Sequence, residues 1–162
     1  MTPEEEASTR LRELLEQEKT TQFDRFDHND SWALGTRFMT EIRERSLPVA
    51  VSIMLGEQRV FHAAGAGTSA DNDAWIDRKI RVVRRFGHSS LAVRTDFEAR
   101  GKNFDRDSHL PLSEYSVFGG AFPILVHECL VGVVGLSGLK HLDDHALVAR
   151  VLAEHLRDQR HG

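Results

Sequence analysis

A row of basic side chains between Asp71 and Ser90 is the part of this sequence best suited to bind a charged partner. The segment reads DNDAWIDRKIRVVRRFGHSS, and its apolar residues recur at the spacing of one helix face. Arg78, Arg81 and Arg85 fall at positions i, i+3 and i+7, so a helix would align their guanidinium groups. Because the whole chain carries a net charge of −4, this local row of cations predicts an anionic partner: a carboxylate ligand, a phosphate, or an acidic surface on another subunit.

The helix that carries this row has recognisable ends. The polar residues 71–73 can cap free amides at its start, and Gly87 suits the left-handed conformation that follows a last turn. Lys79 counts among the basic residues of the polar side. Trp75 begins the apolar side, and we predict that it is mostly buried against a sheet.

A glycine-rich loop before this helix is a second candidate anion site. Its hydroxyls and the amides of residues 72–74 can form an anion-binding nest at a helix start. Asp71 and Asp73 can alternatively serve as paired carboxylates of an enzyme that acts on a small anionic substrate with the loop Gly65–Asp73. A plain strand-to-helix connection with acidic capping residues explains the same pattern. The candidate ligand-binding residues are therefore Gly67, Thr68, Ser69, Asp71, Asp73, Arg78, Arg81 and Arg85.

No catalytic residue is predicted. Cys129 follows His127 and Glu128, but adjacent residues of a strand point to opposite faces, so an inert thiol is the favoured interpretation. Ser137 lies in GLSGL, which lacks the spacing of a nucleophile elbow. The sequence thus favours a protein that is not an enzyme.

Composition limits the remaining functions. The acidic net charge argues against general nucleic-acid binding. One cysteine permits neither an intramolecular disulfide nor a cysteine-based zinc site, and the nine histidines form no HExxH pattern. No apolar run reaches about 18 residues, so membrane insertion is not expected. We predict one cytoplasmic domain spanning residues 1–162, without a metal site.

Hydrophobic periodicity predicts an α+β domain. Two β-rich hairpins are preceded, separated and followed by helices, which favours an antiparallel sheet of about five strands with helices packed on it. The two helices between the hairpins should cover one face of the sheet. Predicted helices span 3–19, 30–46, 71–86, 91–100 and 143–157; predicted strands span 22–26, 49–55, 59–64, 121–127 and 130–137; residues 102–120 are predicted to be loop with one turn.

Three segments carry a resemblance to a known family. DNDAWIDRK…RFGHSS, GGAFPILV and VGVVGLSGLKHLDDHALV, in this order and spacing, resemble uncharacterised protein family 0303, a branch of the haem-degrading-domain group that includes GlcG-like and HbpS-like proteins. The resemblance covers roughly Leu14–Leu156. It implies a profilin-like fold, assembly into homo-oligomers, and a haem or small-ligand role in some relatives.

If haem is the ligand, its iron requires a side chain such as His, Cys, Met or Tyr. His62 and His88 are the candidates, since they bracket the glycine-rich loop and the basic helix, whose arginines could hold the propionates. No CxxCH attachment motif is present. Scattered surface histidines would give the same pattern.

Three functions follow. The favoured one is a non-catalytic, homo-oligomeric small-ligand-binding or scaffold protein, whose arginine row contacts the acidic first helix of a neighbouring subunit or a partner protein. The second is a haem or tetrapyrrole binder, with the haem-degrading activity that some relatives imply. The third is an enzyme acting on a small anion at the glycine-rich loop.

Overall fold

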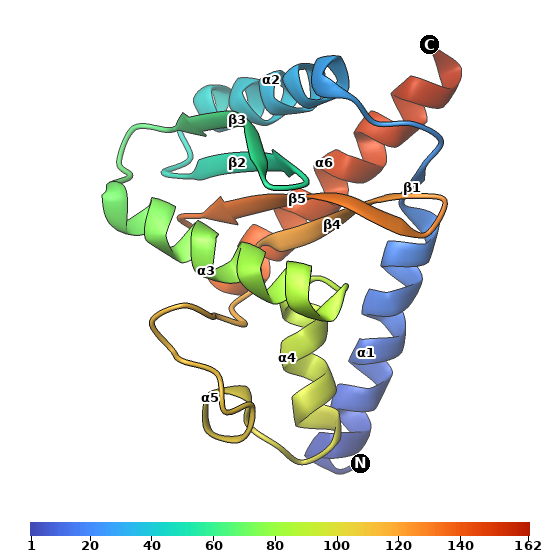
Figure 1. Cartoon of the computed structure of the whole chain (residues 1–162), viewed down its shortest axis with the longest axis vertical. Coiled ribbons are helices and arrows are strands. Elements are labelled where there is room, and N and C mark those ends of the chain that lie inside the picture. The colour runs from blue at the N-terminus through green and yellow to red at the C-terminus, as the bar shows by residue number, and fades with distance from the viewer.

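The structure, a computed structural model, describes residues 1–162 and contains one five-stranded sheet between helices (Figure 1). The strands are β1 (Gln22–Phe23), β2 (Ala50–Leu55), β3 (Gln58–Ala64), β4 (Ala121–Val126) and β5 (Cys129–Ser137). Their order is β1-β4-β5-β2-β3. Two antiparallel hairpins, β2–β3 and β4–β5, join through the antiparallel pair β2–β5.

The prediction of an α+β fold with about five strands is confirmed, but the sheet is mixed rather than wholly antiparallel. β1 pairs with β4 in parallel, through Gln22 opposite Leu125 and Phe23 opposite Val126. The expected strand 22–26 is also shorter. Phe23 is buried in the main core, and Phe26 packs edge-on against it at 5.1 Å, so these two side chains anchor the segment.

Six helices accompany the sheet. They are α1 (Pro3–Thr20), α2 (His28–Glu44), α3 (Ala70–Phe86), α4 (Ser90–Ala99), α5 (Phe104–Asp107) and α6 (His141–His161). The short α5, which Asn103 caps, lies where only loop was predicted. α2 begins earlier than expected because Asp27 forms its capping box. No helix of the chain has both the length and the apolar character needed to span a membrane.

The basic helix, α3, ends as predicted but begins differently. Gly87 has a left-handed φ of 77° after its last turn, as the sequence indicated. At the start, Ser69 is the capping residue, and its capping box with Asn72 replaces the predicted caps. Asp71 and Asp73 therefore lie in the first turn, where their charges face the positive end of the helix dipole.

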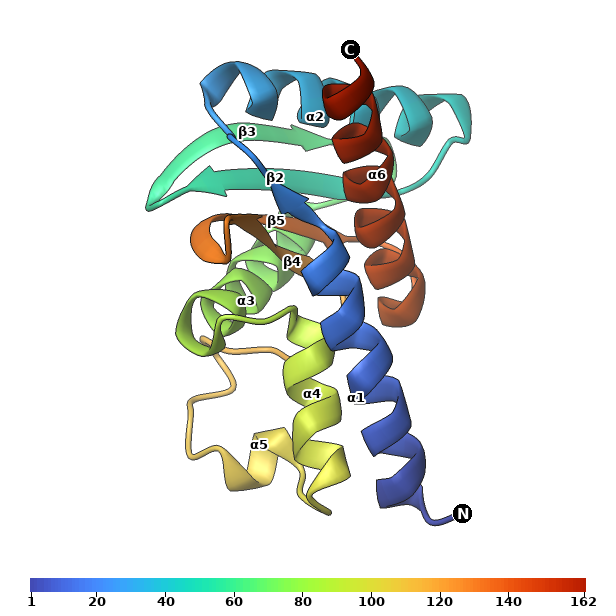
Figure 2. The same ribbon diagram turned by 90° about the vertical axis from the view of Figure 1, so that its right-hand side faces the viewer.

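Helices cover both faces of the sheet (Figure 2). On one face, α2 and α6 enclose the main core of 17 buried residues, among them Phe38, Phe122 and Leu152. On the other face, α3 packs Ile76 and Ile80 against β2, β4 and β5.

The prediction that both helices between the hairpins cover one face is correct for α3 and wrong for α4. α4 runs beside α1, away from the sheet (Figure 1). Its apolar side chains Val93 and Phe97 bury themselves with Val82 of α3, Phe104 of α5 and Val117. The apolar stripe of α4 thus meets its own small core instead of the strands.

The segment from Ser108 to Gly120 returns along α3 and brings a loop to the start of α6. The Ser116 amide donates to the Arg78 carbonyl at 3.2 Å, and the Gly119 amide donates to Nδ1 of His141 at 3.1 Å. This loop, α3 and the start of α6 converge at one end of β5, where they enclose a cleft.

Candidate functional site

A cleft of about 280 Å³ lies where α3, the end of β5 and the start of α6 meet. Its size is close to the lower limit of small-ligand sites, about 300–1,000 Å³. Four parts of the chain line it: Asn72, Trp75 and Lys79 of α3, Phe118 of the returning loop, residues 137–139 after β5, and His141 and Asp144 of α6.

Two aromatic rings form the apolar wall of the cleft. The Trp75 and Phe118 ring centroids lie 5.5 Å apart, edge to face. Phe118 also packs edge-on against His141 at 5.2 Å and remains 40% exposed. An exposed aromatic cluster beside polar groups can take up the flat, apolar part of a ligand.

Lys79 is the buried cation of the cleft. Only 2% of its surface is exposed. Its Nζ donates to the Leu136 carbonyl at 2.8 Å and lies 3.5 Å from Oδ2 of Asp144. A lysine ammonium has three N–H donors, so one remains without a partner in the chain.

Burial changes the proton affinities of this pair. Desolvation lowers the pKa of Lys79, although the nearby Asp144 charge opposes the shift. Desolvation raises the pKa of Asp144 against the effects of Lys79 and of the Leu139 and Gly138 amides. Both shifts narrow the gap between the two pKa values, which makes proton transfer from the amine to the carboxylate easier than in water.

Glycine at position 120 leaves room for the Lys79 amine. Gly120 has a φ of 135°, and a Cβ built there would lie 2.9 Å from Nζ of Lys79 and 2.6 Å from the Leu136 carbonyl oxygen. Any other residue would be strained and would press on the amine. The Gly119-Gly120 pair is thus explained by the close approach of the loop to α3 and α6.

The rim of the cleft is polar. Nδ2 of Asn72 donates to the Ser137 hydroxyl at 3.1 Å. Lys140 gives α6 no side-chain cap. The amides of His141 and Leu142 therefore lack a partner, whereas those of Asp143 and Asp144 donate to the Lys140 carbonyl. Desolvation, followed by the positive charges of Arg94 and Lys79, lowers the pKa of His141. At neutral pH the rim therefore offers hydrogen-bond donors and an uncharged imidazole.

The prediction for Trp75 is correct in part: most of its surface is buried, but its ring lies at the cleft beside Phe118 rather than against the sheet. Its Nε1 donates to Oδ2 of Asp71 at 3.2 Å, and the Arg78 guanidinium lies 4.1 Å from the ring centroid. The neighbouring Ile76 is the residue that enters the core. Trp75 and Ile76 belong to one apolar stripe of α3. Ile76 packs in the core, whereas Trp75 packs against Phe118 of the returning loop.

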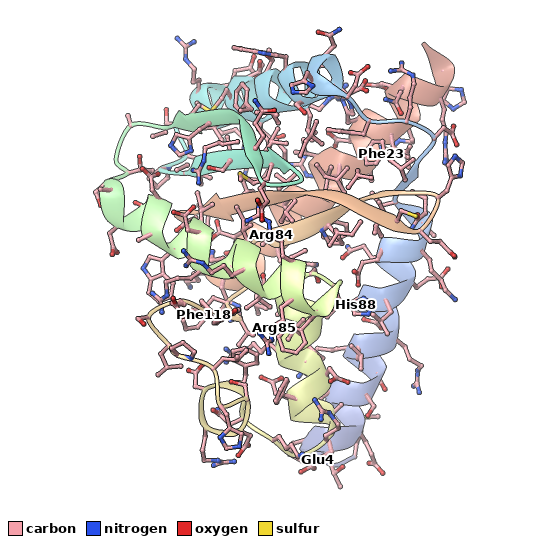
Figure 3. All side chains as sticks on the ribbon, in the orientation of Figure 1. Glu4, Phe23, Arg84, Arg85, His88 and Phe118 are labelled. Carbon is pink, nitrogen blue, oxygen red and sulfur yellow. The ribbon has the colours of Figure 1, made fainter.

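The arginine row has partners within its own chain. These partners are aromatic rings and carbonyl oxygens, so the positive charges are not neutralised by carboxylates. Figure 3 shows Arg84 and Arg85 on different sides of α3. The contacts are Arg78 over Trp75 at 4.1 Å, Arg81 to the Glu114 carbonyl at 3.2 Å, and Arg85 over the Tyr115 ring at 5.9 Å.

The glycine-rich loop satisfies many of its own polar groups. Both the amide and the hydroxyl of Thr68 donate to the Gly65 carbonyl. The Ser69 amide donates to Asn72 and its hydroxyl accepts from the Asp71 amide. Gly67 has a φ of 94° and lies near Pro48. Of this region, Asn72 is the residue that reaches the cleft.

The two histidines predicted as haem ligands lie outside the cleft and contact different elements of the fold. Nδ1 of His62, on β3, lies 2.6 Å from the Ser52 hydroxyl, and its Nε2 lies 3.3 Å from Oδ1 of Asp73. His88 follows α3 and contacts Glu18 of α1 at 3.2 Å (Figure 3). The hydrogen bond to Glu18 raises the pKa of His88.

Sequence reasoning missed Lys79, Asp144 and His141 as site residues. Lys79 did leave a signal, because it lies four residues after Trp75 and four before Val83, on the apolar stripe rather than the polar face. Asp144 left none, since a carboxylate near a helix start is explained by the helix dipole. No group of three or more His, Cys, Asp or Glu side chains is placed to hold a metal ion.

The comparisons with known proteins identify the class to which this fold belongs. A family model described as "Haem degrading protein HbpS-like" matches residues 26–153, and the chain belongs to this family. Within it the chain is a member of UPF0303. A UPF0303 protein of Streptomyces avermitilis is 46% identical over 143 residues, covering 88% of each chain. One of Psychromonas ingrahamii is 38% identical over 145 residues, which is 89% of this chain and 91% of that one.

Solved structures share the fold. The Ybr137w protein matches with a TM-score of 0.84 at 29% identity, over 96% of this chain and 94% of that chain. A PduOC:heme complex matches with a TM-score of 0.67 at 17% identity, over 80% and 94% of the two chains. HbpS matches with a TM-score of 0.63 at 13% identity, over 83% and 92%.

Proposed function

We propose that this protein binds a small organic acid with a flat apolar body in the cleft between α3 and α6. The observation that carries the proposal is the buried Lys79 amine, which retains a free donor beside the Trp75 and Phe118 rings. The amine and the uncapped start of α6 suit a carboxylate. The rings suit an apolar body, and the small volume favours a metabolite of modest size.

The proposed binding requires no serine or cysteine chemistry. The cleft contains no serine or cysteine nucleophile paired with a base, since Ser137 accepts from Asn72 and the single cysteine, Cys129, is exposed on the sheet away from the cleft. The predicted role as a small-ligand-binding protein thus moves from the glycine-rich loop to the neighbouring cleft.

Tryptophan fluorescence tests this binding site. The chain has two tryptophans, and Trp32→Phe leaves Trp75 as the only emitter. Mandelate, an aromatic acid, serves as the probe. We expect saturable change of Trp75 emission during titration, and a Kd about 10- to 100-fold higher in Lys79→Met/Asp144→Asn, because one charge-assisted hydrogen bond contributes about 1.5–3 kcal/mol.

The double substitution is the appropriate control because it removes both charges of the pair and keeps an acceptor for the Leu139 amide. Phenylethanol, which lacks the carboxylate, should bind much more weakly. Equal affinity of mandelate for the two proteins would refute the proposed role of Lys79.

Haem is a second candidate, which the family description favours. The cleft itself does not fit a haem iron. Nδ1 of His141 accepts from the Gly119 amide, so the neutral ring carries its proton on Nε2 and has no lone pair there for a metal. His88 fits better, because its Nδ1 faces the Glu18 carboxylate and its Nε2 is left for coordination.

Absorbance titration with haemin separates these two candidates. If haem binds through His88, a Soret band should form with the native protein and should be absent in His88→Ala. Lys79→Met/Asp144→Asn should leave that band unchanged. A Soret band that persists in His88→Ala would reject His88 as the iron ligand.

Assembly into a homo-oligomer is part of the proposal. β3 is an edge strand, and Phe61 on it packs edge-on against Trp32, which is 63% exposed. An unpaired strand edge beside an exposed aromatic side chain favours association with another copy of the chain.

A further inference from the structure

We propose that Lys79 attaches its ligand covalently: its amine condenses with the carbonyl group of a small 2-oxo acid in the cleft and forms an imine. This inference rests on the proposed function, because the carboxylate and the apolar body of the ligand must first be held there. It adds that the ligand carries a ketone carbon next to its carboxylate.

The position of the amine supports this chemistry. Lys79 is the one buried lysine of the chain, since Lys19, Lys102 and Lys140 are all exposed. Its Nζ lines the cleft and keeps one N–H without a partner. Gly120 allows the amine to lie at this position, because a Cβ at residue 120 would be only 2.9 Å from Nζ. A desolvated lysine in a cleft is the usual form of an imine-forming residue.

Asp144 is placed to carry the protons of the condensation. Its Oδ2 lies 3.5 Å from Nζ of Lys79, and its Oδ1 accepts from the Leu139 amide at 3.0 Å. The ammonium proton of Lys79 passes to this carboxylate and leaves a neutral amine. Burial lowers the pKa of the lysine and raises that of the aspartate, so both shifts favour this transfer.

The reaction is balanced without an oxidant or a reductant. The nitrogen lone pair attacks the carbonyl carbon, a C–N bond forms, and a proton moves from nitrogen to the carbonyl oxygen to give a carbinolamine. Asp144 then returns its proton to the hydroxyl, the C–O bond breaks, and water leaves. The product is a protonated imine on Lys79, and Asp144 is again a carboxylate.

Reductive trapping on the full-length native protein tests the proposal. The protein is incubated near neutral pH with benzoylformate and cyanoborohydride, which reduces an imine to a stable secondary amine. Peptide mapping by mass spectrometry then locates the adduct. We expect Lys79 to be labelled more than any exposed lysine, because its lowered pKa leaves more of its amine neutral and the cleft holds the oxo acid beside it.

Three controls define the outcome. Mandelate has a hydroxyl where benzoylformate has the carbonyl, so it should give no adduct and should slow the labelling by competition. In urea the four lysines should label alike. Asp144→Asn should slow labelling of Lys79, because the amide cannot carry the proton.

The possible results separate this inference from the proposed function. Selective labelling of Lys79 supports the imine. If mandelate and benzoylformate alter Trp75 emission but no adduct forms on Lys79, the imine is refuted and ligand binding stands. If neither compound binds and labelling is spread over the exposed lysines, both proposals fail.

Discussion

At the scale of single residues, the site depends on one lysine that the helical pattern places on the apolar side of α3. Lys79 is buried against Leu136 and Asp144, while its neighbours Arg78 and Arg81 remain at the surface side of the helix. Placing a charge in this position costs stability unless the partner is present. The N–H donor that Lys79 keeps without a partner at the cleft is the reason to attribute a binding role to it.

Removing the lysine alone should therefore destabilise the protein strongly. In Lys79→Met the Asp144 carboxylate stays buried without its cation, and we expect the free energy of unfolding to fall by about 3–5 kcal/mol. Urea denaturation followed by circular dichroism measures this. Lys79→Met/Asp144→Asn should recover most of the loss, and a single variant as stable as the native protein would show that the pair is unimportant for folding.

The limits of sequence reasoning are clearest at this scale. The spacing of Lys79 relative to Ile76, Ile80 and Val83 indicates a place on the apolar stripe. The arginines on either side of it led to its assignment to the polar face. Asp144 is 65 residues away from Lys79, so no local pattern links the two. Their pairing arises only when β5 places α3 and α6 together.

At the scale of elements, caps and alternation predicted most helices and strands, while their packing partners were less predictable. Thr2 forms a capping box with Glu5 at the start of α1, and Ser89 caps α4. The apolar stripe of α4 does not specify what it packs on, and the structure places it in the small core with Val82, Phe104 and Val117. The segment around α5 lacks periodicity because only Phe104 is buried in it.

Contacts between elements also create a pH dependence. His145 of α6 lies 5% exposed, with its Nε2 2.8 Å from Oε1 of Gln17 on α1. Desolvation, with a smaller effect of His141, lowers the pKa of His145 to about 4 from 6.5. The unfolded chain thus binds a proton at a higher pH than the folded chain, so stability falls as pH decreases from 6.5 towards 4.

We expect this histidine to account for about 3 kcal/mol of that loss, from 1.36 kcal/mol per pKa unit. This loss is measured by urea denaturation of the native protein and of His145→Gln across this pH range. The variant cannot titrate at position 145, so its stability should decrease less on acidification. Parallel pH profiles of the two proteins would contradict the assigned pKa of His145.

At the scale of the whole molecule, the family and the α+β fold are those predicted from the sequence. The arginine row is a candidate contact between subunits. Arg81 is exposed and bonds only to a backbone carbonyl, that of Glu114. Its charge is thus available to an acidic surface such as the outer face of α1, where Glu4, Glu5 and Glu6 are exposed.

Reversing this charge should weaken a homo-oligomer. In Arg81→Glu, like charges would meet at the subunit boundary, and light scattering should show a shift towards the 18.3 kDa monomer. Arg157→Glu, at an exposed arginine of α6 that forms no ion pair, serves as the matched charge reversal outside the row. A native protein that is monomeric at high concentration would remove the basis of this prediction, and an Arg81→Glu oligomer of unchanged mass would exclude the row from the interface.

Ligand binding at the cleft between α3 and α6 is tested most directly by a crystal structure of the protein with mandelate. We expect the carboxylate of the probe within hydrogen-bond distance of Nζ of Lys79, with its ring against Trp75 and Phe118. Mandelate bound along Arg78, Arg81 and Arg85 with the cleft empty would contradict the assignment of the site.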